Sequence, residues 1–182
     1  MIWLTSDWHF GHDKPFIYKA RGFNSIQEHD EIVIQHHNEV VQPQDIVYCL
    51  GDCMLGKDYE YGLDCIKQLN GQIYIIRGNH DSDNRWQYYN TIENIFPIGW
   101  SEVIKHEFGY SYLSHYPTET SYIGDNKSLN KRLINFYGHT HTPIIFEFNK
   151  PYQYNVALDA HNCYPVSLEQ AYKDIKEVIT HV

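Results

Sequence analysis

The segment SDWHFGH, residues 6–12, follows the apolar run MIWLT and carries an aspartate and two histidines. Asp7 and His9 stand two residues apart, at the end of an expected strand. Residues i and i+2 of a strand point to the same face and lie about 6–7 Å apart, so this carboxylate and this imidazole could share one ion. A pair of this kind also occurs on ordinary polar surfaces. Its function therefore depends on whether the rest of the chain supplies partners.

Four further polar clusters stand directly after apolar, strand-like runs. They are Gly51-Asp52, GNHD (78–81), SHYP (114–117) and GHTH (138–141). In open α/β sheets, ligands collect at the carboxyl ends of strands. Each cluster alone is compatible with a turn, a polar strand edge or a buried histidine. Together, and with no cluster of thiolates beside them, they indicate a metal site with oxygen and nitrogen ligands rather than a structural zinc site.

The elements expected in the first half of the chain alternate between strands and helices. Strands are expected over residues 1–6, 45–50 and 72–77, and helices over 25–41, 57–69 and 83–90. Ser25 followed by Glu28 has the spacing of a capping box at the start of a helix. This order implies strand–helix–strand crossovers and a largely parallel first sheet.

The second half of the chain has a different pattern, which predicts a second sheet. Residues 99–115 alternate around Gly109 like an antiparallel hairpin. Further strands are expected over 132–139, 143–148 and 152–159, and Ser167 begins a C-terminal helix. Residues 117–131 form a long polar loop between two candidate site segments, and loops of this length are often functional.

Composition restricts the class of protein. The chain has 182 residues and no internal repeat or flexible linker, so we expect one domain over 1–182. Its formal charge of −9 argues against a broad nucleic-acid-binding surface. No run approaches the ~20 apolar residues of a membrane span, and no signal peptide precedes the first strand. The four cysteines have no CxxC spacing, which is typical of free thiols in a cytoplasmic protein.

The series D-x-H … GD … GNHD … H … GHTH, from Asp7 to His141, resembles the calcineurin-like metallophosphoesterase family. The resemblance is closest to its small, single-domain bacterial and phage members, and it extends into the tail NVALDAHNCYPVSLEQ. It implies an α/β fold, a four-layer αββα sandwich with two mixed β-sheets. It also implies a binuclear metal centre at the strand ends.

The resemblance assigns metal ligands residue by residue. Asp52 would bridge two divalent metal ions. Manganese is the first expectation for these ions, and iron, zinc, nickel and magnesium are the alternatives. Two ions about 3.5–4 Å apart can hold a phosphoryl group and share a hydroxide that attacks phosphorus. The ligands expected besides Asp52 are Asp7, His9 and His141 at the first ion and Asn79, His115 and His139 at the second.

The resemblance also implies residues that act on the substrate. His80 is the expected catalytic residue that binds no metal, and it would stabilise charge or protonate the leaving group, which suits the pKa of imidazole. Asp81 would orient the His80 ring. Asn79 and His12 are the expected substrate-binding residues.

The function expected from these residues is that of a metal-dependent phosphoric ester hydrolase, a phosphodiesterase or phosphatase for phosphodiesters or small phosphorylated molecules. One alternative is a nuclease or nucleic-acid end-processing phosphoesterase, and the other is a non-catalytic scaffold with this fold. The segment GDCMLGK replaces the GDxVDRG of the protein serine/threonine phosphatases, which argues against that activity. We expect a small phosphorylated substrate as the partner, no membrane, and nucleic acid only as the less favoured choice. The sequence leaves open the physiological substrate, the preference for monoester or diester, the native metal, the oligomeric state and the role of loop 117–131.

Overall fold

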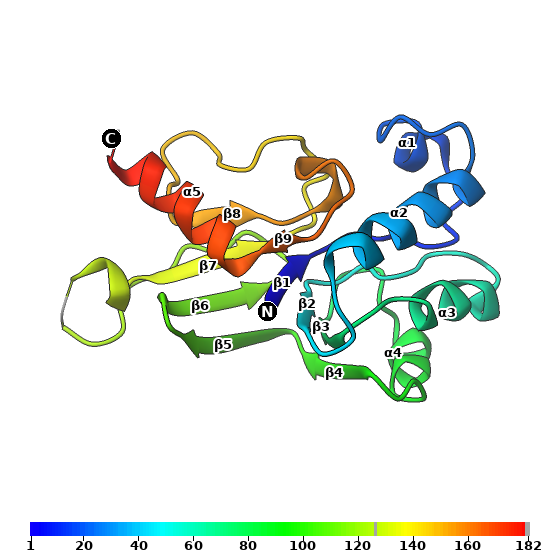
Figure 1. Cartoon of the computed structure of the whole chain (residues 1–182), viewed down its shortest axis with the longest axis horizontal. Coiled ribbons are helices and arrows are strands. Elements are labelled where there is room, and N and C mark those ends of the chain that lie inside the picture. Colours follow the sequence, from blue (N-terminus) through cyan, green and yellow to red (C-terminus); the bar gives the residue numbers. More distant parts are fainter. Residues whose placement is uncertain (126, 181–182) are drawn as a thin grey trace.

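The computed structural model describes residues 1–125 and 127–180, which form two β-sheets and the helices around them (Figure 1). The first sheet has five strands in the order β4-β3-β2-β1-β9. Strands β1 to β4 run parallel, and β9 pairs antiparallel with β1, so the sheet is mixed. Its strands are β1 (Ile2–Thr5), β2 (Ile46–Cys49), β3 (Gln72–Ile76), β4 (Ile95–Gly99) and β9 (Val166–Ser167).

Three helices cover one face of this sheet (Figure 1). They are α2 (Ile26–Val40), α3 (Tyr59–Lys67) and α4 (Asp83–Tyr89). The side chain of the residue before each helix accepts a backbone N–H of its first turn, and at α2 this is the expected bond from Glu28 to Ser25, 3.1 Å long. Apolar side chains of these helices pack on Val47, Ile73 and Ile75. They form one core cluster with the outer face of the sheet.

The second sheet has four strands in the order β5-β6-β7-β8. Strands β5 and β6 form the expected antiparallel hairpin, whereas β6, β7 and β8 run parallel. A second core cluster joins the inner faces of both sheets to α5 (Leu168–Thr180), which lies away from α2, α3 and α4 (Figure 1). The strands are β5 (Ser101–His106), β6 (Gly109–Ser114), β7 (Leu133–Tyr137) and β8 (Gln153–Asn155).

The expected fold class, an α/β sandwich with two mixed sheets, is confirmed. The strand expected over 143–148 is wrong, because this segment is irregular. Its apolar residues Ile145 and Phe146 still pack against the second core cluster, and burial of this kind requires no strand. The sequence did not indicate α1 (Pro15–Tyr18), β4 or β9. Helix α1 is only about one turn long, and β9 has only two residues.

Strand register brings the polar clusters to one edge of the sandwich. Thr5 is paired with Cys49, and Cys49 with Ile75, so β1, β2 and β3 end side by side. In the second sheet, Leu113 is paired with Phe136, and the N–H of Gly138 donates to the carbonyl of His115 over 3.0 Å. Over residues 1–125 and 127–180, no helix has the length and apolar character needed to cross a membrane.

Candidate metal centre

Backbone strain is concentrated at the strand ends. Among the described residues, eight that are not glycine have a positive φ, and five of them are Asp7, His9, Asp52, His139 and His141. For a residue with a Cβ, this conformation costs about 1–3 kcal/mol of conformational free energy, so it persists only where the surrounding structure imposes it. Strain of this kind clusters at functional sites. Five of the seven expected metal ligands therefore share an unfavourable backbone conformation.

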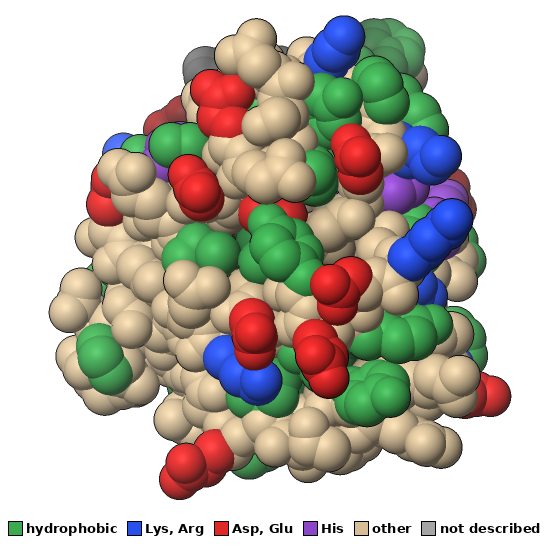
Figure 2. All heavy atoms as spheres, turned by 90° about the vertical axis from the view of Figure 1, so that its right-hand side faces the viewer, with side chains coloured by type: hydrophobic (Ala, Val, Ile, Leu, Met, Phe, Trp, Pro, Cys, Tyr) green, Lys and Arg blue, Asp and Glu red, His purple; other side chains and the backbone are tan. Residues whose placement is uncertain are grey.

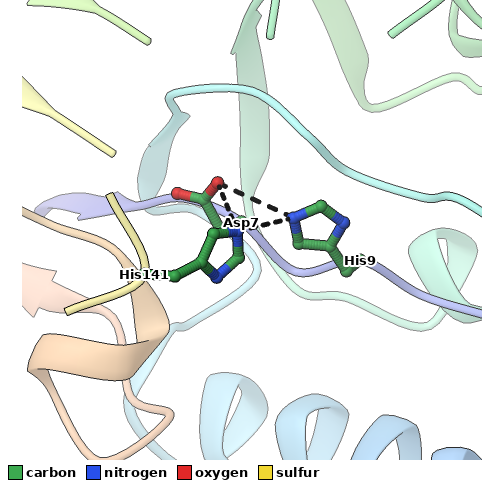
Figure 3. A group of neighbouring side chains, drawn as sticks. All are labelled: Asp7, His9 and His141. Carbon is green, nitrogen blue, oxygen red and sulfur yellow. Dashed lines mark hydrogen bonds and ion pairs between the residues drawn. The ribbon is translucent and has the colours of Figure 1, made fainter. Parts of the chain in front are cut away.

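Asp7, His9 and His141 form the first group of potential ligands (Figure 3). The Nε2 atoms of His9 and His141 lie 3.1 Å apart. Asp7 Oδ1 is 3.8 Å from His9 Nε2 and 3.7 Å from His141 Nε2. This oxygen is buried and accepts no hydrogen bond. A buried carboxylate oxygen without a donor, facing two imidazole nitrogens, fits a divalent cation.

Asp7, Asp52 and His115 form the second group. His115 Nε2 lies 3.5 Å from Asp52 Oδ2 and 2.9 Å from Asn79 Oδ1. The ring of His139 is 5.0 Å from the ring of His115, measured between centroids. The structure thus brings all seven expected ligands into one cluster. It also gives Asp7 a place in both groups, which the sequence did not indicate.

The Asp52 carboxylate belongs to the second group and also faces His9 of the first. Its Oδ2 atom is 3.7 Å from His9 Nε2 and 3.5 Å from His115 Nε2. Its Oδ1 atom accepts the backbone N–H of His80 over 2.8 Å. Asp52 is thus oriented by its neighbour in the GNHD segment, with one oxygen left to face both groups.

Two glycines allow the strand ends to approach each other this closely. A Cβ at Gly78 would meet the Asp52 side chain, and a Cβ at Gly138 would meet Ser6 Oγ and Asp7 Oδ2. The backbone N–H of His139 donates to Asp7 Oδ2 over 2.8 Å. Glycine at position 138 therefore lets the GHTH turn contact the carboxylate of the first segment directly.

His80 and His12 lie at the open side of the cluster. The His80 side chain is 42% exposed, and its Nε2 is 4.0 Å from Asp52 Oδ2. The ring of His12 is 5.3 Å from that of His9 and 6.3 Å from that of His80. Burial lowers the pKa of His12 to about 4, so this ring is neutral near pH 7. Both residues flank the expected ligands without belonging to either group.

In the described part of the chain, the Asp81 carboxylate, which we expected to orient the His80 ring, accepts its hydrogen bonds from other groups. Its Oδ2 accepts the backbone N–H groups of Gly78 and Asp52, each over 2.8 Å. Its Oδ1 accepts the N–H of Cys53 over 3.2 Å and the Tyr89 hydroxyl over 2.8 Å. The four donors are three backbone N–H groups and one tyrosine hydroxyl, and none is the His80 ring. Asp81 instead ties the GNHD turn to the turn that carries Asp52.

The electrostatics of the cluster favour a cation. Burial raises the pKa of the Asp7 carboxyl and lowers that of the His9 imidazole well below its ordinary value. Burial also lowers the pKa of His115, but its hydrogen bond to Asp52 and the charge of Asp7 outweigh this and raise the pKa to about 9. Burial raises the pKa of Asp52, yet His115 and the backbone of His80 lower it overall. In the polypeptide alone, the His115 imidazolium thus supplies positive charge that a metal ion would replace.

Sequence reasoning missed two residues behind this cluster. Asp159 Oδ2 lies 3.1 Å from His141 Nδ1, and the Arg21 guanidinium forms a salt bridge with Asp159 over 2.7 Å. Asp159 lies within the quoted tail NVALDAHNCYPVSLEQ, but no spacing rule joins it to a histidine 18 residues earlier. Arg21 lies in a loop outside every motif, so only the folded chain reveals it.

Comparisons with known proteins identify the family of this chain. The model of the calcineurin-like phosphoesterase superfamily domain matches residues 1–156. An uncharacterised protein of Methanocaldococcus jannaschii is 31% identical over 181 residues, which cover 97% of this chain and 92% of that protein. The gene 66 protein of Mycobacterium phage L5 is 28% identical over 176 residues, covering 79% of this chain and 78% of that protein. The chain therefore belongs to the calcineurin-like phosphoesterase superfamily.

A solved structure supports the fold independently. A protein of unknown function from Aquifex aeolicus superposes with a TM-score of 0.68 and 20% sequence identity, covering 95% of this chain and 98% of that chain. Membership in a superfamily of phosphoesterases supports hydrolase activity for this chain, and the two groups of potential ligands are consistent with a metal-dependent enzyme.

Proposed function

We propose that this chain is a metal-dependent phosphoesterase that hydrolyses phosphodiesters or small phosphorylated molecules with two divalent metal ions, manganese being the first choice. The observation that carries the proposal is the position of Asp52. One of its carboxylate oxygens lies within 3.7 Å of a histidine nitrogen from each ligand group. A carboxylate oxygen between two sets of ligands is suited to bridging two ions.

The donor set fits divalent ions of intermediate softness. Asp7, His9 and His141 would hold the first ion, and His115, His139 and Asn79 the second. Imidazole, carboxylate and amide ligands suit manganese, iron, nickel and zinc, and no thiolate is in either group. When bound, such a pair of ions neutralises the charge of a phosphoryl group and makes a water nucleophilic near neutral pH.

The residues at the open side would act on the substrate. Asn79 is exposed, and its amide oxygen lies 2.9 Å from His115, so its NH₂ group is free to donate to a phosphate oxygen. His80 lies beside Asp52 with much of its ring exposed, where it could protonate a leaving oxygen. His12, held neutral by burial, would contact the rest of the substrate.

Surface charge makes a small substrate the better choice than nucleic acid. On the face shown in Figure 2, acidic side chains are spread over the surface, and the fewer basic ones lie mostly along its right edge near histidines without forming a continuous patch. The formal charge is −9 for the whole chain. Tight binding to a nucleic-acid backbone depends on clustered Lys and Arg. We therefore propose a small phosphorylated molecule as the partner, and a nucleic-acid substrate is an outcome that the assay must distinguish.

Metal analysis coupled to a substrate screen tests the proposal. Protein is stripped with chelator, reconstituted with Mn²⁺, analysed for bound metal, and assayed on phosphomonoesters, phosphodiesters, cyclic nucleotides and single-stranded DNA. The wild-type chain should bind two ions and hydrolyse at least one class of small ester. Asp52→Asn should lose activity and reduce occupancy at both positions.

Asp64→Asn is the matched control, because Asp64 is exposed on α3, where its carboxylate pairs with Lys67. This variant should behave like the wild type. Full retention of two ions and normal turnover in Asp52→Asn would contradict the bridging role. Hydrolysis confined to DNA would replace a small-molecule substrate with the nuclease alternative.

A further inference from the structure

A chain of hydrogen bonds through Arg21 and Asp159 lies directly behind the first group of ligands. Arg21 donates through Nε to Asp159 Oδ1 over 3.2 Å and through Nη2 to Asp159 Oδ2 over 2.7 Å. The same Oδ2 lies 3.1 Å from His141 Nδ1. The Arg21 side chain is 1% exposed and that of Asp159 is 10% exposed. A bidentate arginine–carboxylate pair with so little exposed surface holds the two side chains in one fixed orientation, unlike an exposed ion pair.

The donor inventory fixes the tautomer of His141. A carboxylate paired with a guanidinium through both oxygens is ionised and can only accept hydrogen bonds. His141 Nδ1 must therefore carry the hydrogen that Asp159 accepts. The other nitrogen, Nε2, then keeps its lone pair, and it is the atom that faces Asp7 Oδ1 and His9 Nε2. Only this tautomer leaves a lone pair directed at the first ion position.

Arg21 also holds the segment that carries Asp7 and His9. Its Nη2 donates to the carbonyl of Asp7 over 2.8 Å, and its Nη1 donates to the carbonyl of Trp8 over 3.4 Å. Both carbonyls belong to a segment in which Asp7 and His9 adopt positive φ. The guanidinium thus stabilises an unfavourable backbone conformation that the peptide would not adopt alone.

A second branch reaches the same segment from α2. Arg21 Nη1 lies 2.9 Å from His29 Nε2, and since the guanidinium has no acceptor, His29 accepts at this atom. His29 then donates through Nδ1 to Asp30 Oδ1 over 2.7 Å. Asp30 Oδ2 accepts the backbone N–H of Gly11 over 2.9 Å. The network therefore holds the ligand segment at Asp7 and Trp8 and again at Gly11, after His9.

We propose that Asp159 and Arg21 are positioning residues for the first ion. Asp159 sets His141 in the Nδ1–H tautomer. Arg21 holds both Asp159 and the Asp7–Trp8 backbone, and so fixes the position of His141 relative to Asp7 and His9. The part of this inference that concerns the ion rests on the proposed function. The tautomer and the backbone conformation belong to the polypeptide itself. Partners of this kind change metal affinity about 10–100-fold when they are removed.

The first measurement reads the tautomer without any metal. Long-range ¹H–¹⁵N correlation spectra of the chelator-treated, histidine-labelled protein distinguish Nδ1–H from Nε2–H rings, and His141→Gln identifies the signal. Spectra are recorded above the pH at which this ring titrates. The wild-type ring should be in the Nδ1–H form. An Nε2–H ring in the wild-type protein overturns the proposal.

The second measurement uses a double variant that leaves no buried charge unpaired. Removing one partner of a buried ion pair leaves the other partner as an uncompensated buried charge, whereas replacing both partners by apolar residues is often tolerated. In Arg21→Met/Asp159→Leu, the His141 ring should exchange between tautomers and the affinity for the first Mn²⁺ should fall about 10–100-fold. Should this variant fail to fold, Asp159→Asn serves instead, because its amide turns a donor toward either Arg21 or His141.

The control is Asp174→Asn on α5. Asp174 also accepts hydrogen bonds, but from Tyr154 and Gln170 rather than from Arg21 or His141. This variant should keep both the tautomer and the Mn²⁺ affinity. A fixed Nδ1–H ring or unchanged affinity in the double variant overturns the positioning role. Failure of the wild-type chain to bind Mn²⁺ would instead overturn the proposed function, while the spectra still decide the tautomer.

Discussion

The most direct test of how this site is built is Asp81→Asn. The Asp81 carboxylate is buried and accepts four hydrogen bonds, three from backbone N–H groups and one from Tyr89. Asparagine has the same shape but only one acceptor oxygen. Its NH₂ group would face either the pair of donors at Oδ1 or the pair at Oδ2, so two hydrogen bonds are lost whichever way the amide turns.

The magnitude follows from these contacts. Hydrogen bonds to a charged group contribute about 1.5–3 kcal/mol each, so the loss of two should lower the free energy of unfolding by roughly 3–6 kcal/mol. Tyr89→Phe removes a single donor from the same carboxylate and should cost about 1.5–3 kcal/mol. Asp83→Asn should cost less than about 1 kcal/mol, because Asp83 is 86% exposed in its pair with Arg77.

Urea unfolding of chelator-treated protein measures the three variants in the absence of metal. The unfolding midpoint should fall most in Asp81→Asn, less in Tyr89→Phe and least in Asp83→Asn, with equal slopes. Turnover of the reconstituted Asp81→Asn enzyme should fall as well, because the Asp52 and GNHD turns separate. A variant with wild-type stability and low turnover would refute this reasoning and return Asp81 to a role in the chemistry of His80.

Three further predictions follow from the same geometry. His80→Ala should keep two bound ions and lose about 10²–10⁴-fold in turnover, with a smaller loss for esters of nitrophenol, and loss of metal would make His80 a ligand. The pKa of His115 is raised to about 9 in the metal-free chain, so protonated His115 stabilises the fold fully below its ordinary pKa near 6.5, and this stabilisation is lost as pH rises through about 9. The urea midpoint of metal-free wild type should therefore fall over that pH range, and the midpoint of His115→Gln should lack this fall. Gly138→Ala should reduce metal content and stability, since its Cβ would meet Ser6 and Asp7, whereas Gly124→Ala meets no atom within 4 Å and should cost only about 1–2 kcal/mol for its positive φ.

The sequence by itself determined which candidate ligands the chain carries and the order of most of its elements. Asp7 and Asp52 each follow an apolar run of the expected parallel sheet, and this position alone predicts that parallel strands bring them to one edge. The capping pattern at Ser25 also predicted where α2 begins. These features are local, because apolar periodicity and cap residues act within a few positions along the chain.

Only the tertiary structure decided how the candidate ligands are held. Asp81 serves two turns that are 28 residues apart, and Arg21 reaches Asp159 across 138 positions. No periodicity connects such partners, because a buried carboxylate takes whatever donors the fold places around it. Residues 143–148 also show what only the tertiary structure decides, because they have the apolar pattern of a strand and yet remain irregular. Strand β8 already pairs with β7, and Ile145 and Phe146 pack on the core without any strand pairing.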